Sequence, residues 1–588
     1  MIYDQQLADF LAETKVVATR ASDLSAIGDR GENLVNWQLD FNRLSLTDMF
    51  VEYKFVVQQL THATIDDALR LSLMDKVMKV ANPLIVKLHQ LYQTQSGFLN
   101  ETQQQALDMA LSTHYLGIMF FHSVWHRLAS QPKPTEKGRI ANLLSRYKQP
   151  TSHHEQLIQI CVYGMMSLLH RALFEKYIGY REDTTVIWRT LNRCYRFIQA
   201  QGWQDVICEM PSLYLGKNQP SLVNLYQQCL LGALSNPYAC RRTDILQLQN
   251  NSVAWSKDLL IPISEAKKPF IYVDLLNDSP PTLLLSEVRY NPFAVDSEAI
   301  FINLEPLMQR LAATIKEGKN VPTSQNKVAA RHANILLHNL NELIQPTPAC
   351  NISQSQCQAV IGFSQIHYML SGKIPFGKLI QAHLLPPHLR PVEQNVDMLN
   401  KSTVVNVMGS LLTERHLRRS FNYHTFDHQT QLLSQQAYAS SPLTQLQVKS
   451  LVALYQDNAE YKGWQLNCIC KLQQRTTSSA EQPTDTTTSH VQELTIDAWV
   501  QMLGDNVVAC GVRLKTPDSR QEYFVPALII PRNAKLGHQY TSLMMARFGY
   551  NPGDKLVMRI GREEVDITLT ELINFSDDVE EFTFVRLS

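Results

Sequence analysis

The chain has 588 residues, of which 45% are hydrophobic and 18% are charged, and this composition is typical of a globular protein rather than a disordered one. Its length predicts several domains, because single hydrophobic cores stop growing at about 250–300 residues. Lys and Arg together number 54, as do Asp and Glu, so no net charge attracts the chain to DNA, RNA or an anionic membrane. Any anion-binding site must therefore be local.

Cysteine usage and the amino-terminal sequence favour a cytoplasmic location. The ten cysteines include no Cys-x-x-Cys pair, which predicts reduced, mostly buried thiols and no zinc site. The first residues lack the basic and apolar segments of a secretory signal. Apolar stretches such as 115–125 are far shorter than a membrane span, so no membrane span is expected.

Residues 1–250 are predicted to form a helical domain. Apolar residues recur at helical spacing from 46 to 60. Asp66 lies in a segment that offers an N-cap for the next helix. Longer periodic runs cover 152–177 and 184–199, and pairs of stacked helices would account for this pattern.

His122 and His126 are four residues apart, the spacing at which two metal ligands share one helical face. The intervening Ser-Val-Trp lacks the glutamate of a metalloprotease helix, and a third ligand is absent. We therefore interpret both histidines as residues of a helix core or surface.

Residues 251–395 are predicted to form a mixed α/β domain. Short apolar runs at 259–263, 270–275 and 282–288, separated by turn residues, predict a small sheet. Amphipathic helices are then predicted at 303–315 and 328–344, and a helical segment punctuated by glycines precedes a proline-rich connector at 386–391.

The remainder is predicted to be mostly β, with a barrel at 396–472, a polar flexible loop or linker at 473–490, and a β-rich region at 491–588 that completes the barrel or forms a second one. The fold class is thus α+β multidomain, with a large N-terminal helical region, a small mixed α/β middle and one or more C-terminal β-barrels. The individual strands are expected at 450–455, 464–472, 493–503, 506–514, 522–530, 555–560 and 566–569.

The densest basic cluster in the chain, 413–419, lies at the junction between the helical and β parts and contains Arg415, Arg418 and Arg419. Three arginines in such a place form either a solvent-exposed turn or an anion-binding site. The sequence motifs around the cluster help to decide between a turn and a binding site.

Arg415 and Arg419, four residues apart ahead of a β region, resemble the RxxxR signature of PilZ domains, the bacterial receptors for cyclic di-GMP. The second signature of these domains is (D/N)xSxxG. Its nearest match keeps the serine as Ser434, whereas Leu432 stands for the Asp or Asn and Ala437 for the glycine. Residues 443–454 and 464–472 are similar to the barrel strands that follow.

The rest of the chain resembles the long multidomain proteins of this kind that are associated with type IV pilus-driven twitching motility, through 236–238, 272–281 and 361–368. The resemblance implies a non-enzymatic, cytoplasmic cyclic-di-GMP receptor that is recruited to the cell pole or the pilus machinery. It implies protein partners for the helical region and a cyclic-dinucleotide site formed by Arg415, Arg418, Arg419 and Ser434.

Arginine suits this ligand because its planar fork donates two hydrogen bonds to a phosphate and stacks on a guanine. Leu432 removes one polar contact, and a lost charge-assisted hydrogen bond of roughly 1.5–3 kcal/mol lowers affinity about ten- to a hundredfold.

Two alternatives stay open at this point. A protein-interaction scaffold with a degenerate barrel that no longer binds nucleotide is favoured by Leu432 and Ala437. An enzyme is disfavoured because the sequence contains no glycine-rich phosphate loop, no GxSxG elbow and no HExxH helix.

Overall fold

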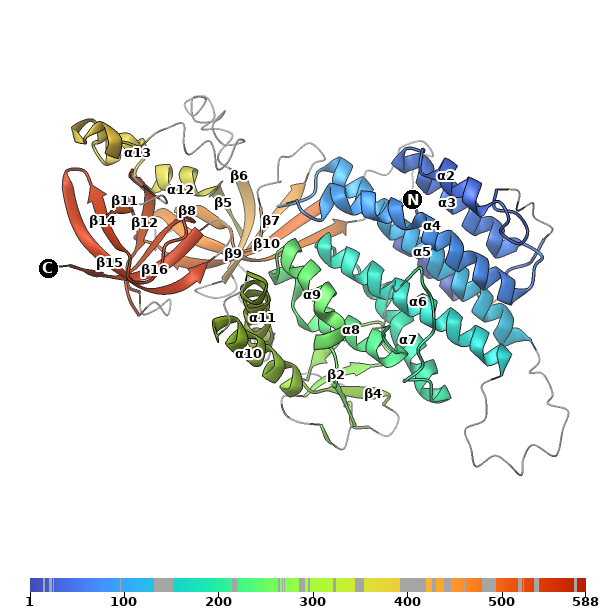
Figure 1. Ribbon diagram of the computed structural model, residues 1–588. Coiled ribbons are helices and arrows are strands. Elements are labelled where there is room, and N and C mark those ends of the chain that lie inside the picture. The colour runs from blue at the N-terminus through green and yellow to red at the C-terminus, as the bar shows by residue number, and fades with distance from the viewer. Residues whose placement is uncertain are drawn as a thin grey trace. The chain divides into compact units, whose positions relative to one another are not determined.

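Figure 1 shows a computed structural model of the chain, which forms two compact units. One unit comprises Met1–Gln95 and Leu99–Gln345, and the other comprises Pro346–Ser588 with Ser96–Phe98. The structure describes residues 1–13, 16–20, 24, 26–95, 97–131, 152–213, 219–262, 265–266, 268, 270–284, 291–294, 297–320, 324–343, 354–391, 419–425, 430–437, 446–457, 462–477, 493–516, 521, 523–533, 539–575 and 579–587.

The first unit is built mainly of helices whose interior is closely packed. A Cβ atom on Gly117 would lie 2.5 Å from the Leu168 side chain, and one on Gly164 would lie 2.7 Å from Phe121. These glycines therefore let two long helices approach closely. The helices are α1 (Asp4–Ala12), α2 (Leu34–Phe41), α3 (Leu46–His62), α4 (Asp67–Tyr92), α5 (Glu101–Ser130), α6 (His153–Ile178), α7 (Thr185–Gln201), α8 (Leu222–Leu234), η2 (Pro237–Ala239) and α9 (Arg242–Trp255).

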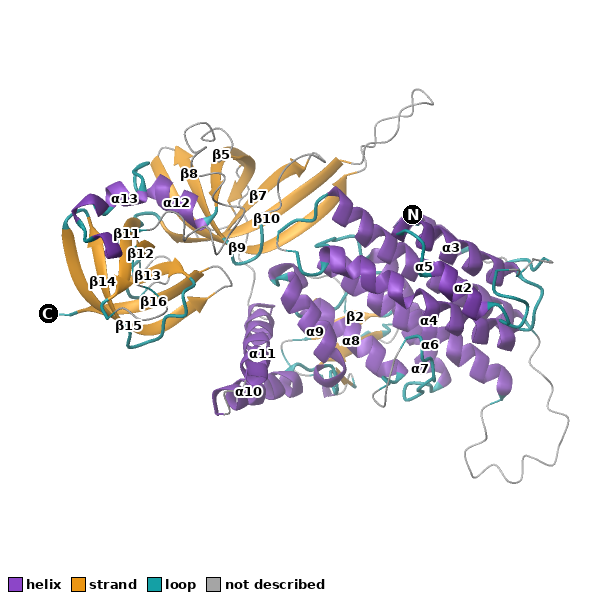
Figure 2. Ribbon diagram, turned by 45° about the horizontal axis from the view of Figure 1, so that its top comes forward, coloured by secondary structure: helices purple, strands orange, loops and turns teal. Residues whose placement is uncertain are grey.

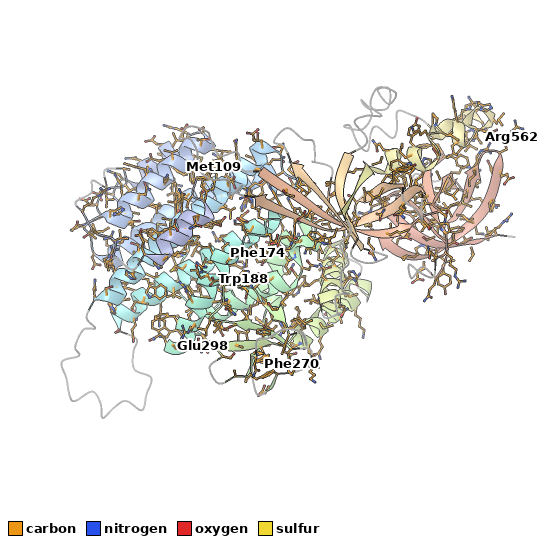
Figure 3. All side chains as sticks on the ribbon, turned by 180° about the vertical axis from the view of Figure 1, so that it is seen from behind. Met109, Phe174, Trp188, Phe270, Glu298 and Arg562 are labelled. Carbon is orange, nitrogen blue, oxygen red and sulfur yellow. The ribbon has the colours of Figure 1, made fainter. Side chains whose placement is uncertain are left out.

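Helix α6 forms the centre of this unit. Among the described residues it is the one helix that is long and apolar enough to cross a membrane, and 83% of its most apolar 18-residue window is buried. Phe174 on α6 and Trp188 on α7 are fully buried within the unit (Figure 3). The apolar stretch of α6 is thus longer than those noted in the sequence, but its burial assigns it to the core.

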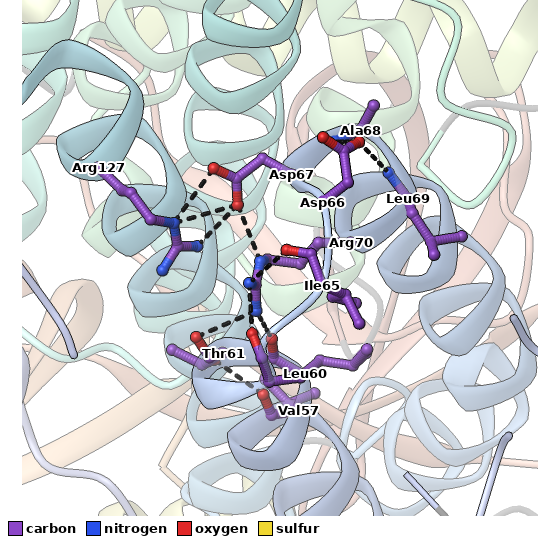
Figure 4. A network of polar contacts seen from close by, with 11 residues as sticks. Val57, Leu60, Thr61, Ile65, Asp66, Asp67, Ala68, Leu69, Arg70 and Arg127 are labelled. Atoms are coloured by element: carbon purple, nitrogen blue, oxygen red, sulfur yellow. Dashed lines mark hydrogen bonds and ion pairs between the residues drawn. The ribbon is translucent and has the colours of Figure 1, made fainter. Parts of the chain in front are cut away.

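A buried charge network joins α3, α4 and α5 (Figure 4). Asp66 caps α4 by accepting hydrogen bonds from the amides of Ala68 and Leu69. Arg70, 1% exposed, donates to carbonyl oxygens at the end of α3, including Ala63 O at 2.6 Å. Asp67 accepts from Arg70 Nε at 2.9 Å and from Arg127 Nε of α5 at 3.1 Å. The last carbonyls of α3 are therefore satisfied by a side chain instead of water.

The same unit contains a small antiparallel sheet that packs on the helices through specific polar contacts. Asn192 Nδ2 of α7 donates to Asn277 O at 2.8 Å, and Arg189 Nε donates to Asp278 at 2.8 Å. The sheet was predicted from its apolar runs, and β4 is an additional strand. Its order is β1 (Leu260–Ile261), β4 (Ala299–Ile302), β2 (Ile271–Asp274) and β3 (Thr282–Leu283), and the helices that follow are α10 (Glu305–Asn320) and α11 (Ser324–Leu343).

The second unit contains two closed six-stranded barrels, seen as strands in Figure 2. The region 491–588 therefore does both things left open by the sequence, because β10 completes the first barrel and the later strands form a second. The first barrel has the order β10 (Glu493–Gly504), β7 (Thr430–Ala437), β6 (Arg419–Thr425), β5 (Gln354–Ile361), β8 (Leu451–Asp457) and β9 (Lys462–Thr477). The second has the order β11 (Val508–Leu514), β12 (Val525–Ile530), β13 (Ser542–Ala546), β16 (Val579–Arg586), β15 (Glu563–Phe575) and β14 (Lys555–Ile560).

The predicted fold class of a helical region, a small mixed middle and C-terminal barrels is confirmed. Individual strands differ from the expectation, because β5, β6, β7, β13 and β16 were not among the predicted strands and β9 and β15 are longer than predicted. Strand β5 lies before the predicted barrel, and β9 extends to Thr477, into the range predicted as a linker. Gln473 pairs with Asp497 and Thr477 with Glu493, so the backbone ladder extends this polar strand where side-chain patterning gives no signal.

Residues 362–391, between β5 and β6, form a docking segment that packs on the second barrel. The ring of His367 lies with Nε2 3.0 Å from Cys510 O, and Arg559 Nε donates to Ile380 O at 2.6 Å. A Cβ on Gly511 would lie 2.8 Å from Ile380. The segment contains α12 (Phe363–Leu370), α13 (Phe376–Leu379), η4 (Ala382–Leu384) and η5 (Pro387–Leu389).

The buried network predicts that Asp67→Ala destabilises the helical unit strongly, because two buried guanidinium groups lose their carboxylate. We expect a loss of about 3–5 kcal/mol in chemical denaturation followed by the helical circular-dichroism signal. The matched control is Asp40→Ala, which breaks an i,i+3 pair with Arg43 whose side chains are 77% and 78% exposed and should cost less than about 1 kcal/mol. Equal losses for the two variants would contradict the assignment.

The close approach at Gly511 predicts that Gly511→Ala loosens the docking segment, because the new methyl overlaps Ile380 and Phe376. Overpacking of this kind costs about 1–3 kcal/mol, measured as earlier proteolysis within residues 362–391. Gly377→Ala is the control, since its Cβ would meet Ala382 at an ordinary 3.8 Å. Identical proteolysis of both variants would show that the contact at Gly511 does not hold the segment.

Candidate ligand site on the first barrel

The inner and outer faces of the first barrel follow from strand alternation and burial. Ala498 and Val500 of β10 are 1% and 0% exposed, and Leu472 of β9 is 0% exposed. These residues face the barrel interior, as alternate positions of a strand share one face. By alternation Asp497 and Trp499 belong to the outer face, where Asp497 is nevertheless covered (1% exposed) and Trp499 is half-buried.

Position 434 lies in an outer row of polar residues that crosses four strands. Ser434 pairs with Asn422 of β6 on one side and with Asp497 of β10 on the other. Asp497 in turn pairs with Gln473 of β9. The predicted serine is therefore at the middle of the strand layer formed by β6, β7, β10 and β9, and not at its margin.

Of the three predicted arginines, the structure describes only Arg419. Arg419 is the first residue of β6 and pairs with Ala359 of β5. Asn422, the partner of Ser434, is three positions further along β6, so positions 419 and 434 belong to opposite faces of the sheet. Arg415 and Arg418 lie outside the described residues. The structure thus brings the two signature strands side by side but does not place 419 and 434 on one face.

A second outer row contains residues that the sequence did not single out. Leu432 pairs with Trp499, and Trp499 pairs with Lys471. The Lys471 ammonium lies 4.4 Å from the centre of the Trp499 ring, a cation–π geometry. Both side chains are half-buried. A polar stretch separates Trp499 from Lys471 in the chain, so only the strand register reveals the pair.

The barrel interior offers a different chemistry. Gln465 and Asn467 of β9 are 6% and 0% exposed, and Asn467 Nδ2 donates to Gln465 O at 3.1 Å. Their side-chain oxygens, Gln465 Oε1 and Asn467 Oδ1, have no hydrogen-bond partner within the described part of the chain. Buried acceptors repel a phosphate, so an anionic ligand is suited to the outer face.

The titratable clusters of the helical unit serve its packing. Glu175 accepts hydrogen bonds from His89 Nε2 and Tyr92 Oη, both at 2.6 Å. Burial alone would raise the pKa of Glu175, but His89, His114 and the Tyr92 bond together lower it. His122 stacks on His126 with ring centres 6.1 Å apart, and the described residues contain no group of three or more potential metal ligands.

The comparisons with known proteins agree with this architecture. The family model of the N-terminal domain of the cyclic-di-GMP receptor FimW matches residues 36–265, and that of the FimW C-terminal β-barrel domain matches residues 510–587. The chain belongs to this family of cyclic-di-GMP receptors. No curated protein and no solved structure matches.

The two matched ranges bracket the first barrel. In this FimW-family chain they cover α3 to α9 of the helical unit and nearly all of the second barrel. The predicted relationship to long multidomain cyclic-di-GMP receptors is confirmed, and cyclic di-GMP is the ligand of the family. The residues of the two PilZ-like signatures lie between the matches.

His170 generates a prediction about pH. Its ring packs on Phe174 with centres 4.8 Å apart, and neither ring nitrogen has a hydrogen-bond partner within the described residues. Burial lowers the pKa of His170 to about 3. The unfolded chain binds a proton below about pH 6.5, so this residue costs stability as the pH falls from that value toward 3.

We therefore expect His170→Phe to raise the unfolding midpoint of the helical unit more at pH 5 than at pH 8. The comparison of the two pH values is independent of any fixed packing cost of the new ring. His153→Phe, at the exposed first residue of α6, should show no such difference. A gain that is the same at both pH values would exclude the proton linkage.

Proposed function

We propose that this chain binds cyclic di-GMP on the outer face of its first barrel, through Ser434 and through Arg415 and Arg418 of the segment before β6, with Arg419 contributing from the edge of the barrel where β6 begins. The observation that carries the proposal is the placement of Ser434 beside β6, the strand that directly follows the arginine cluster. The arginines would donate to phosphate oxygens and stack on guanine, and the serine would donate to a phosphate. Because Arg419 is the first residue of β6, Arg415 and Arg418 would have to reach the ligand from the start of that strand.

In this proposal the protein is a non-enzymatic, cytoplasmic receptor. Binding of cyclic di-GMP would shift an equilibrium between two arrangements of the chain, by no more than the difference in affinity for them. The output would be regulation of the type IV pilus or of surface attachment at the cell pole. The absence from the sequence of the common catalytic motifs supports a receptor over an enzyme.

Exposed apolar residues support protein partners for the helical unit. Val35 and Leu39 on α2 are 70% and 56% exposed, and Val51 and Phe55 on α3 are 58% and 48% exposed. Residues four apart share one face of a helix, so each helix presents an apolar pair to solvent. Surfaces of this kind mark interaction sites.

The proposal predicts that cyclic di-GMP binds the full chain in calorimetric titration and that Arg415→Ala/Arg419→Ala abolishes most of the affinity. Two lost charge-assisted contacts of roughly 1.5–3 kcal/mol each lower affinity by at least about a hundredfold. The control is Arg562→Ala/Arg586→Ala, which removes two exposed arginines of the second barrel. No heat from the unmodified chain would overturn the proposal, and unchanged binding by the Arg415/Arg419 variant would place the ligand elsewhere.

A further inference from the structure

We infer that Trp499 and Lys471 complete the cyclic-dinucleotide site, with the Trp499 ring stacking on a guanine and the Lys471 ammonium pairing with a phosphate. This inference rests on the proposed function and assigns two residues that neither signature contains. Both lie on the outer face of the first barrel, on β10 and β9.

The register places Trp499 at the predicted ligand position. Trp499 is the direct partner of Leu432, and Asp497, two residues before it, is the direct partner of Ser434. Trp499 and Ser434 are thus a diagonal pair on adjacent strands, a separation of about 7–8 Å that large side chains can span. A planar ligand held at position 434 would lie within reach of the indole ring.

The strand register also suggests what replaces the signature residue that is missing at position 432. The second signature has Asp or Asn where this chain has Leu432, so a polar contact with the ligand is missing. Trp499 lies directly opposite that position. An aromatic face gives a nucleobase a contact of another kind, because every base has a π-face that stacks on an aromatic ring. The barrel can therefore keep the ligand without the signature residue.

The Lys471–Trp499 contact shows which groups lie together at this point of the outer face. The ammonium occupies one face of the ring at 4.4 Å, as a guanine would. Both side chains are half-buried, and a cation–π contact that is not fully desolvated is weak enough to be exchanged. When a base takes the ring face, the ammonium is released next to it, where the base's own phosphate is. The lysine then neutralises a charge that the stacked base brings with it.

The neighbouring carboxylate is less accessible to a ligand than the ammonium is. Asp497 is 1% exposed, whereas Lys471 is half-buried, so the face presents the ammonium to an anion. The interior of the barrel presents the opposite character, with the unpaired oxygens of Gln465 and Asn467. The ammonium outside the barrel and the unpartnered amide oxygens inside it therefore favour a phosphate at Lys471 over one in the interior.

The test is a fluorescence and calorimetric titration of the full chain with cyclic di-GMP. The chain has seven tryptophans, and stacking should quench the signal of Trp499 in the unmodified protein. Trp499→Phe should keep most of the affinity and lose most of the quenching. Trp499→Ala should lower affinity about tenfold, the typical effect of removing one base-stacking ring. Lys471→Gln should lower it by a similar factor and reduce the salt dependence of binding.

Lys555→Ala, at an exposed position of β14 in the second barrel, is the control and should bind as the unmodified chain does. Unchanged affinity of both Trp499→Ala and Lys471→Gln, with the unmodified chain binding normally, overturns this inference and leaves the proposed function standing. Failure of the unmodified chain to bind overturns both. Quenching that persists in Trp499→Phe shows that another tryptophan lies at the ligand and also overturns the inference.

Discussion

Closure of the first barrel is the constraint on which the second unit depends. Strand β5 must pair with β6 on one side and with β8 on the other, although residues 362–418 separate β5 from β6. That connection therefore begins and ends at neighbouring strands. Its first part docks on the second barrel, and its last part carries the arginine cluster to the start of β6. One connection thus binds the two barrels together and delivers the basic segment to the strand next to Ser434.

The two barrels share a core because of this connection. Ile366 and Met369 of α12 pack in one cluster with Val360, Ala453 and Leu466 of the first barrel and with Leu528, Ile530 and Met544 of the second. Closely packed interiors transmit displacement instead of absorbing it. The interior of the helical unit differs from this apolar core, since it contains charged groups such as Arg70, Asp67 and Lys176. Each of these groups has specific hydrogen-bonding or ionic partners.

The sequence predicts best the helices and strands that have one face in the core and the other in solvent, because their apolar residues recur at a regular spacing. The helices from 46 to 60 and from 152 to 177 were evident because apolar residues recur at helical spacing, and the hairpin of β8 and β9 because its strands are apolar and separated by a turn. Strands β6 and β7 carry mostly polar residues, as does the first half of β5, and their backbone pairing is what closes the barrel. Their pattern alone gives no such information.

The candidate site shows the same limit. A motif search finds Arg415, Arg419 and Ser434 because the residues of each signature lie at a fixed spacing along the sequence. Trp499 and Lys471 are brought together by a ladder that includes a register shift between Trp499 and Val500, which no spacing rule predicts. The opposite faces of positions 419 and 434 are likewise a property of the pairing of β6 with β7.

The path by which a bound ligand would affect the rest of the second unit follows from strand β10. This strand carries Asp497 and Trp499 on its outer face, pairs with β7 and β9, and ends at Gly504, only three residues before β11 of the second barrel begins at Val508. Leu503 and Val507, on either side of that turn, are buried in the core that the barrels share. In the proposed binding mode, a ligand that stacks on Trp499 would act on this shared core through β10. The second barrel would then be coupled to ligand binding although it contributes no residue to the proposed site.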